Sequence, residues 1–248
     1  MRTLFLTISF LLIIITIPVL SQTTESTVMI PNIDERVEIY FSSGRPVLDL
    51  SGNPVNGIAY SEYENGQLDL KIQFRLGVPY GPWKEFYENG QLLSKKSYKD
   101  GVKNGTMEWY WMNGQLRWKG TYKDGKLDGL VEYFHENGEL SMRGAYILGE
   151  RNGLWKYFYD NGQRKGTFKD GERNGLWMFI YENGQLGNKS FYKDGERNGP
   201  VETYYRNGQL KEKGNYKDGE LDGPYEEFNE EGELLRKGKY MNGEFISD

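Results

Sequence analysis

Glycine recurs in three columns along this chain, at a spacing that repeats eight times. One column is the glycine of an Asn-Gly pair, replaced by Glu-Gly in the last unit, and a second glycine follows eleven residues later, or nine in one unit. A third column opens each unit, at Gly57, Gly81, Gly105, Gly129, Gly153, Gly175, Gly199 and Gly223. Successive units are 24 residues long, apart from one of 22. A period of about 20–50 residues is typical of solenoids, propellers and arrays.

Each unit is expected to form two short strands joined by tight turns. Asn-Gly and Asp-Gly pairs tolerate positive φ and are typical of β-hairpin turns. An aromatic column closes the second strand, at Phe74, Tyr98, Tyr122, Tyr146, Phe168, Tyr192, Tyr216 and Tyr240. Side chains alternate along a strand, so we expect leucines such as Leu92 to share a face with this column. Apolar residues five positions after the opening glycine, such as Phe86, are expected on the opposite face.

The pattern predicts an all-β fold: an elongated, twisted antiparallel β-meander of about eight 24-residue β-hairpin repeats over residues 57–248. The 32 glycines argue against long helices, because each interior glycine costs roughly 0.5–1 kcal/mol relative to alanine. A closed propeller is less favoured, since its blades usually need four strands and about 40 residues. The unit that begins at Gly153 lacks two residues, a loss that keeps later side chains on their faces.

Residues 1–21 have the layout of a secretory signal peptide. Arg2 supplies a positive charge, an apolar run follows, and cleavage is predicted before Gln22. The expected location is therefore secreted or periplasmic. The alternative is an uncleaved N-terminal membrane anchor, which would bring the chain into contact with a membrane. Residues 22–56 are predicted to be a capping segment, a degenerate repeat that protects the first sheet edge.

The residue types exclude most catalytic and metal chemistry. The chain has no cysteine and a single histidine, His135, which stands in a column of tyrosines and tryptophans and is expected to be a packing variant. The aspartates of the Asp-Gly turns are expected to form turns, because calcium loops need several oxygen ligands per ion. We expect no enzymatic activity, no catalytic residue, no cofactor and no metal ion. The net charge of −5 gives no drive toward nucleic acid.

Aromatic residues make up 15% of the chain and crowd into units three to five. Such a surplus is typical either of a core that covers the sheet or of a binding surface. The candidate binding residues are Trp109, Trp111, Trp118, Tyr133, Trp155, Tyr157 and Trp177. A ladder of rings can grip an extended polypeptide or stack on sugar rings.

The repeat reads Tyr-Lys-Asp-Gly-Glu-Arg-Asn-Gly, then an aromatic segment and Asn-Gly-Gln-Leu. With these residues, 57–248 resembles the MORN-repeat variant family, in particular exported bacterial members, many of which are described as antitoxin components of toxin–antitoxin systems. The resemblance implies a β-meander used for binding and carries no catalytic residues. The favoured function is a non-catalytic exported module that binds another protein. The alternatives are binding of a cell-wall or surface glycan, and an antitoxin or immunity role toward a co-encoded toxin.

Overall fold

The computed structural model describes residues 27–29 and 45–247, which form one sheet of 20 strands. The strands are β1 (Thr27–Met29), β2 (Gly57–Glu62), β3 (Leu68–Arg75), β4 (Val78–Phe86), β5 (Leu92–Lys99), β6 (Val102–Lys103), β7 (Gly105–Tyr110), β8 (Leu116–Lys123), β9 (Lys126–Phe134), β10 (Leu140–Ile147), β11 (Glu150–Tyr159), β12 (Gly162–Lys169), β13 (Glu172–Tyr181), β14 (Leu186–Lys193), β15 (Glu196–Tyr204), β16 (Leu210–Lys217), β17 (Glu220–Leu221), β18 (Gly223–Phe228), β19 (Leu234–Met241) and β20 (Glu244–Ser247). β6 and β7 both pair with β5, and β17 and β18 both pair with β16, so each couple is one interrupted strand.

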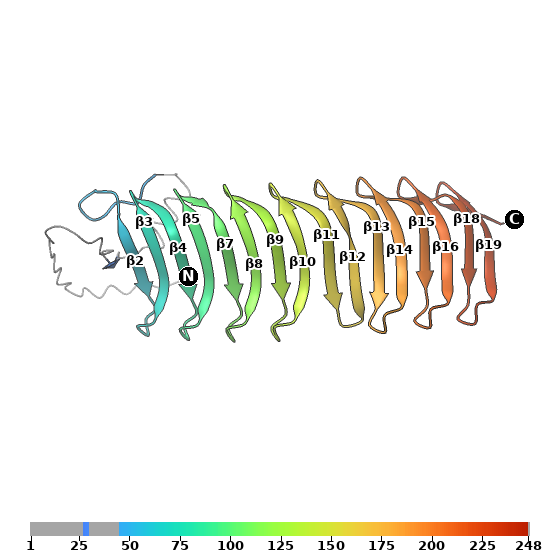
Figure 1. The fold of residues 1–248 in the computed structure, drawn as a ribbon, viewed down its shortest axis with the longest axis horizontal. Helices are drawn as coiled ribbons and strands as arrows, with labels where there is room; N and C mark the ends of the chain where they lie inside the picture. Colours follow the sequence, from blue (N-terminus) through green and yellow to red (C-terminus); the bar gives the residue numbers. More distant parts are fainter. Residues whose placement is uncertain (1–26, 30–44, 248) are drawn as a thin grey trace, which may run out of the picture.

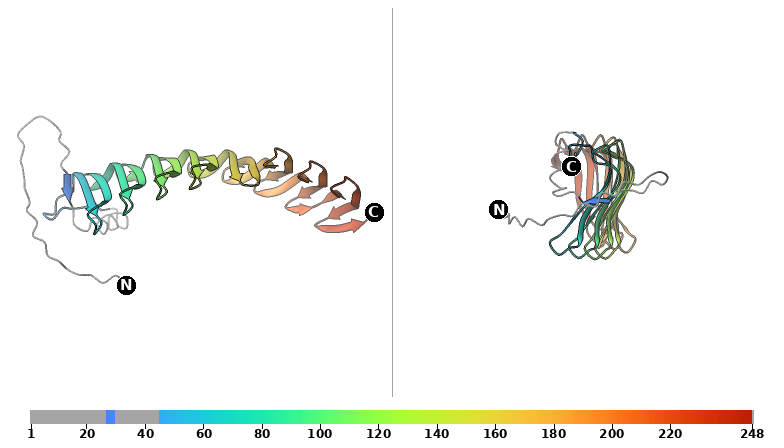
Figure 2. Two further views of the ribbon diagram at one scale, coloured as in Figure 1. Left: turned by 90° about the horizontal axis from the view of Figure 1, so that it is seen from below. Right: turned by 90° about the vertical axis from the view of Figure 1, so that its left-hand side faces the viewer.

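Neighbours in the sequence are neighbours in the sheet. From β2 to β20 the pairing is antiparallel throughout, while β1 lies parallel to β2. The strands stand side by side in chain order along the long axis (Figure 1), and this single open layer is twisted and gently curved (Figure 2). The predicted antiparallel meander is confirmed.

Two-residue turns, mostly Asp-Gly, line the upper edge of the sheet in Figure 1. Asp100 and Gly101 have φ of 49° and 79°, as a type I′ turn requires. The turn glycine also donates its N–H to a carbonyl of the preceding repeat, at 2.9 Å from Gly101 to Pro79 and 3.0 Å from Gly171 to Arg151. These hydrogen bonds join each repeat to its neighbour along this edge.

The Asn-Gly turns on the opposite edge are joined by side chains. Asn113 Nδ2 donates to a carbonyl of the next turn at 2.8 Å, and the Tyr87 hydroxyl donates to a carbonyl of the next repeat at 2.8 Å. Repeats one, two, six and seven have both bonds, and in repeat three Trp111 Nε1 takes the place of the hydroxyl. The series is interrupted in repeats four and five, where His135 and Tyr159 occupy the ring position and make no such bond to any described residue.

The core is a column of side chains two positions after each opening glycine. All its members are buried, and they are Ala59, Trp83, Met107, Val131, Trp155, Trp177, Val201 and Tyr225. Tyr98 of the closing aromatic column pairs with Gly81, two residues from Trp83, and therefore lies on the same face. The two columns together bury the apolar side of this one-layer sheet.

A fourth glycine column lies opposite the core column, and aromatic rings cover it. The core residues of five repeats pair across the hairpin with Gly120, Gly144, Gly166, Gly214 and Gly238. A Cβ atom added to Gly144 would lie 2.1 Å from the Trp155 ring, and one added to Gly166 would lie 2.1 Å from Trp177. Since the described residues form no second layer over this face, the rings shield the backbone, and the glycines leave space for them.

A β-bulge corrects one expectation about the faces. In the β4–β5 hairpin, Glu85 pairs with Ser94 and Phe86 with Leu92, so Leu93 is an extra residue in the second strand. Directly opposite residues share a face. The expectation that Leu92 lies with the closing aromatic column is therefore wrong, because the bulge moves it to the opposite face beside Phe86.

The short unit that begins at Gly153 keeps the register by losing this bulge. β11 and β12 pair without a break, with Tyr157 opposite Arg164, and a two-residue turn joins them. The two missing residues are thus one loop residue and one bulge residue. Trp155 still pairs with Gly166, so the core column continues through this unit, as the sequence predicts.

Both ends of the repeat array carry extra segments. Val47 and Val55 are buried with the core of the first repeats, and the Val47 N–H donates to the Gly77 carbonyl at 2.7 Å. At the other end, the ring of Phe245 in β20 lies 5.2 Å from that of Tyr240. The predicted signal peptide, 1–21, lies outside the described residues, as do residues 22–26 and 30–44 of the predicted capping segment.

Leu148 is expected to destabilise its turn. It has φ of 51° and is 65% exposed at a position that most repeats fill with aspartate. The left-handed conformation costs an ordinary residue roughly 1–2 kcal/mol, and Asn and Asp tolerate it best. Leu148→Asn should therefore raise the free energy of unfolding by about 1 kcal/mol in urea titrations. The reverse change in another repeat, Asp194→Leu, should lower it, and unchanged urea midpoints in both variants would contradict the prediction.

Gly144→Ala is expected to lower the free energy of unfolding by about 1–3 kcal/mol, because Trp155 must leave its place. Near-ultraviolet circular dichroism should show the displaced indole, and urea unfolding should give the energy. Gly214→Ala is the matched control in the same column, where the nearest atom, on Tyr225, lies 3.2 Å from an added Cβ. Equal losses in the two variants would show that the ring contact is not the cause.

Candidate functional site

A row of half-buried side chains crosses the middle of the sheet on the core face. We call it the aromatic row, and its members are Trp109, Trp118, Tyr133, Met142, Tyr157 and Phe179. Successive members are opposite each other on adjacent strands, with Arg164 between Tyr157 and Phe179. Adjacent strands are about 4.8 Å apart, so the row is continuous along the long axis of the molecule.

The rings of the row meet edge to face. The centroids of Trp109 and Trp118 are 4.9 Å apart at an interplanar angle of 74°, and those of Trp118 and Tyr133 are 6.1 Å apart at 74°. This geometry is favourable for aromatic pairs, because the ring edge is positive and the face negative. The part of the row from Trp109 to Tyr133 therefore has an uneven apolar surface of edges and faces, whereas Tyr157 lies at 29° to Trp155 and 34° to Trp177 of the core column.

Polar side chains border the aromatic row at both ends. On one side Ser94 lies opposite Trp109, and Lys96 forms an ion pair with Glu85 at 2.6 Å. Although burial alone would raise the pKa of Glu85, hydrogen bonds from Lys96 and Ser94 hold it below its usual value. On the other side Asn188 follows Phe179. An apolar patch with a polar rim is typical of an interaction site.

The structure divides the predicted binding residues into three groups. Four lie together in the aromatic row: Trp109, Trp118, Tyr133 and Tyr157. Trp155 and Trp177 belong to the core column, where they are 0% and 4% exposed. Trp111 lies at the Asn-Gly edge, where its Nε1 donates to a carbonyl of the next repeat at 3.3 Å. The structure thus brings together only part of the predicted set.

The additional tryptophan of unit three has a packing role. A Cβ on Gly120 would lie 2.4 Å from Trp118, so this ring covers the glycine as Trp155 covers Gly144. The core column carries Met107 and Val131 on the two strands beside Gly120, and neither has a ring. Trp118 therefore takes over the shielding and at the same time contributes to the aromatic row.

Arginines form a second feature of this face, which the sequence analysis missed. Arg151 and Arg173 each lie 4.7 Å from the ring centroid of a core tryptophan, Trp155 and Trp177, as cation–π pairs. Arg197 lies in the same way 5.0 Å from Tyr216. The pattern was available in the sequence, because Glu-Arg-Asn-Gly recurs at 150–153, 172–175 and 196–199.

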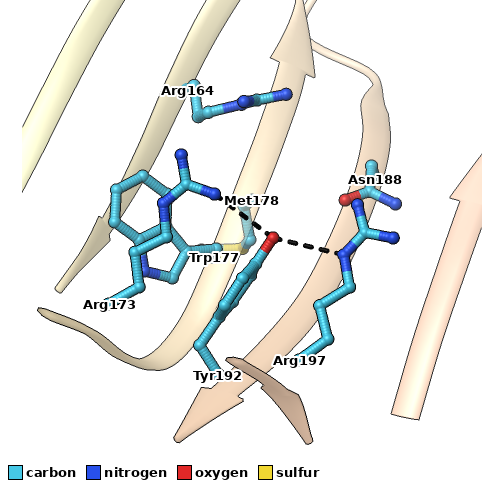
Figure 3. A pocket seen from close by; sticks show the side chains of 7 residues that line it. All are labelled: Arg164, Arg173, Trp177, Met178, Asn188, Tyr192 and Arg197. Atoms are coloured by element: carbon cyan, nitrogen blue, oxygen red, sulfur yellow. Dashed lines mark hydrogen bonds between the residues drawn. The ribbon is translucent and has the colours of Figure 1, made fainter. Parts of the chain in front are cut away.

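Three arginines line a cleft next to the aromatic row. Its volume is about 80 Å³, and it is lined by Arg164, Arg173, Trp177, Met178, Asn188, Tyr192 and Arg197 (Figure 3). Arg173 Nη1 and Arg197 Nε donate to the Tyr192 hydroxyl oxygen at 3.4 and 3.3 Å. We call this the arginine cleft.

The arginines change the acidity of the tyrosine between them. Burial alone would raise the pKa of Tyr192, but hydrogen bonds and charge from Arg197 and Arg173 lower it below the usual value. The same contact with Tyr192 raises the pKa of Arg197, which therefore stays charged. The cleft is thus positively charged at neutral pH.

The opposite face differs in character. Leu130 and Leu154 are about half exposed there, at 55% and 53%. Lysines on this face pair with glutamates, as in the 2.7 Å contact between Lys189 and Glu202. The apolar and charged groups on that face are therefore mixed.

The described part of the chain has no cluster of side chains placed to form a metal centre. His135 is exposed at the Asn-Gly edge. Within 27–29 and 45–247, no three His, Asp or Glu side chains are placed to hold a metal ion. The same ranges contain no helix of the length and apolar character needed to cross a membrane.

Tyr192 is expected to ionise at lower pH than Tyr204. A hydrogen bond to Glu202, together with burial, raises the pKa of Tyr204 to about 12, whereas guanidinium groups favour the phenolate of Tyr192. Carbon NMR of the tyrosine Cζ atoms as a function of pH measures the pKa values of Tyr192 and Tyr204. Arg197→Gln should raise the pKa of Tyr192 and leave Tyr204 unchanged, and an unmoved Tyr192 would contradict this assignment.

The family model for the MORN repeat variant matches the chain in eight segments. They are residues 55–75, 79–100, 103–124, 127–147, 151–170, 173–195, 197–218 and 221–242, well over half of the chain. No curated protein shows significant sequence similarity to it.

Proposed function

Because the chain belongs to the MORN repeat variant family and carries the aromatic row on one face, we propose that it binds another protein and has no catalytic activity. The observation that supports this most is the continuity of the row. Five half-buried rings lie along seven successive strands from Trp109 to Phe179, with Met142 and Arg164 on the two strands between them and polar residues at both ends. Aromatic residues and arginine are the types enriched at protein interfaces.

The ring geometry favours a polypeptide over a sugar as the ligand. Trp118 lies against Gly120 and packs edge to face with Trp109 and Tyr133. Rings packed in this way leave less open, flat face for a sugar ring to stack on, and their uneven surface suits the apolar side chains of a polypeptide.

The proposal includes export of the chain. Residues 1–21 would direct it across the membrane and be removed before Gln22, as the sequence predicts. The partner would then be a protein of the envelope or the exterior, and an exported antitoxin or immunity role would be one form of this function.

Loss of the aromatic row should abolish partner capture without unfolding the chain. Trp109, Tyr133 and Tyr157 would be changed together to threonine, which unit seven carries at the equivalent position, Thr203. Capture from the envelope fraction of the source organism, with quantitative mass spectrometry, should fall at least about tenfold, because aromatic anchors contribute most of the energy at such interfaces. The recovered chain should begin at Gln22.

The matched control carries Leu130→Thr and Leu154→Thr on the opposite face, and it should capture the partner normally. Threonine is native at the equivalent position of unit three, Thr106. Equal capture by the row variant and the control would refute the role of the row. Retention of the chain on peptidoglycan or polysaccharide, with no protein enriched, would refute protein binding and favour the glycan.

A further inference from the structure

The arginine cleft concentrates positive charge in an acidic protein. The chain has a net charge of −5, yet Arg164, Arg173 and Arg197 face one cleft of about 80 Å³. The residues that line it, all within the described range, include no carboxylate. Figure 3 shows the guanidinium groups arranged around the hydroxyl of Tyr192.

Most of the hydrogen-bonding capacity of these arginines is unused inside the protein. A guanidinium carries five N–H donors. Arg173 gives one hydrogen bond, to Tyr192, and Arg197 gives one to Tyr192 and one to Tyr216 at 2.9 Å. Arg164 is exposed and makes no hydrogen bond or ion pair with any described residue. The cleft therefore has donors for a ligand that accepts several bonds.

Several lysines elsewhere in the sheet form ion pairs with carboxylates. On the opposite face Lys189 pairs with Glu202 and Lys213 with Glu226, both at 2.7 Å. On the cleft face the next carboxylate along the row belongs to Glu212, which already accepts hydrogen bonds from Thr203 and Tyr225. The positive charge of the arginine cleft is thus left for something outside the chain.

We propose that the arginine cleft binds the carboxylate side chain of an acidic polypeptide segment lying along the aromatic row. Arginine forks match carboxylates with two parallel hydrogen bonds, and a cleft of this volume admits one side-chain group. Arg164 lies within the row, between Tyr157 and Phe179, so one extended segment reaches the rings and the cleft together. The identity of the ligand as a polypeptide rests on the proposed function.

The test uses the full chain and a small probe, N-acetyl-triglutamate amide, with triglutamine amide as the uncharged control. Proton–nitrogen NMR of the arginine side chains should show signals of Arg164, Arg173 and Arg197 shifting with triglutamate and not with triglutamine. Arg164→Gln should weaken binding about threefold to fivefold, the range for a partly exposed charge pair. Because Arg164 has no described partner, this change leaves the fold intact.

Lys165→Gln is the matched control for net charge. Lys165 is the residue next to Arg164, and its side chain points to the opposite face. The Lys165→Gln variant should therefore bind triglutamate as the parent chain does. No shift with triglutamate, equal weakening in the two variants, or binding of inorganic phosphate alone would each overturn the proposal. Triglutamate has no aromatic or branched apolar side chain to pack on the aromatic row, and triglutamine has the same methylene groups, so a difference between the two probes reports on the carboxylates alone. If triglutamate binds but the row variant still captures its partner, only the proposed function fails.

Discussion

A single-layer sheet has no second layer to keep water from its backbone, and ring-over-glycine packing solves this problem here. Trp155 covers Gly144, and Trp177 covers Gly166, so that each ring lies against bare main chain. The other features of this face follow from it. Arginines lie over the outer faces of the same rings, and the closing aromatic column fills the space beside them. On this face the buried rings are thus separated from solvent by a single layer of side chains.

The architecture was predictable because turns and periodicity are local properties. Asp100-Gly101 takes the left-handed conformation that its residue types favour, and the eight repeats follow one another without crossovers. The loss of two residues after Gly153 also left the later side chains on their expected faces, although one residue is missing from the loop and the other from the bulge. These predictions needed no knowledge of which residues touch across the sheet.

The assignment of rings to core or surface was not predictable in the same way. Trp118 and Trp155 are the same residue type, but Trp118 is half-buried in the aromatic row and Trp155 is fully buried in the core column. Leu92 lies on the face opposite to the expected one because Leu93 is an extra residue in its strand, and the sequence of one repeat does not show where such a bulge lies. The arginine cleft combines residues of four strands, from Arg164 to Arg197, and depends on register that only the assembled sheet fixes.

The interrupted side-chain bonds at the Asn-Gly edge change how neighbouring repeats are coupled in the middle of the array. In a repeat protein, stability is the sum of the stability of each repeat and the coupling between neighbours. Around His135 and Tyr159 that coupling rests on the strand ladder, the Asp-Gly edge and the core face, where Trp155 and Trp177 pack on the preceding repeat and donate to its carbonyls. Repeats four to six are therefore held together through the face that carries the aromatic row. A ligand bound along the row would lie over the packing that couples these repeats.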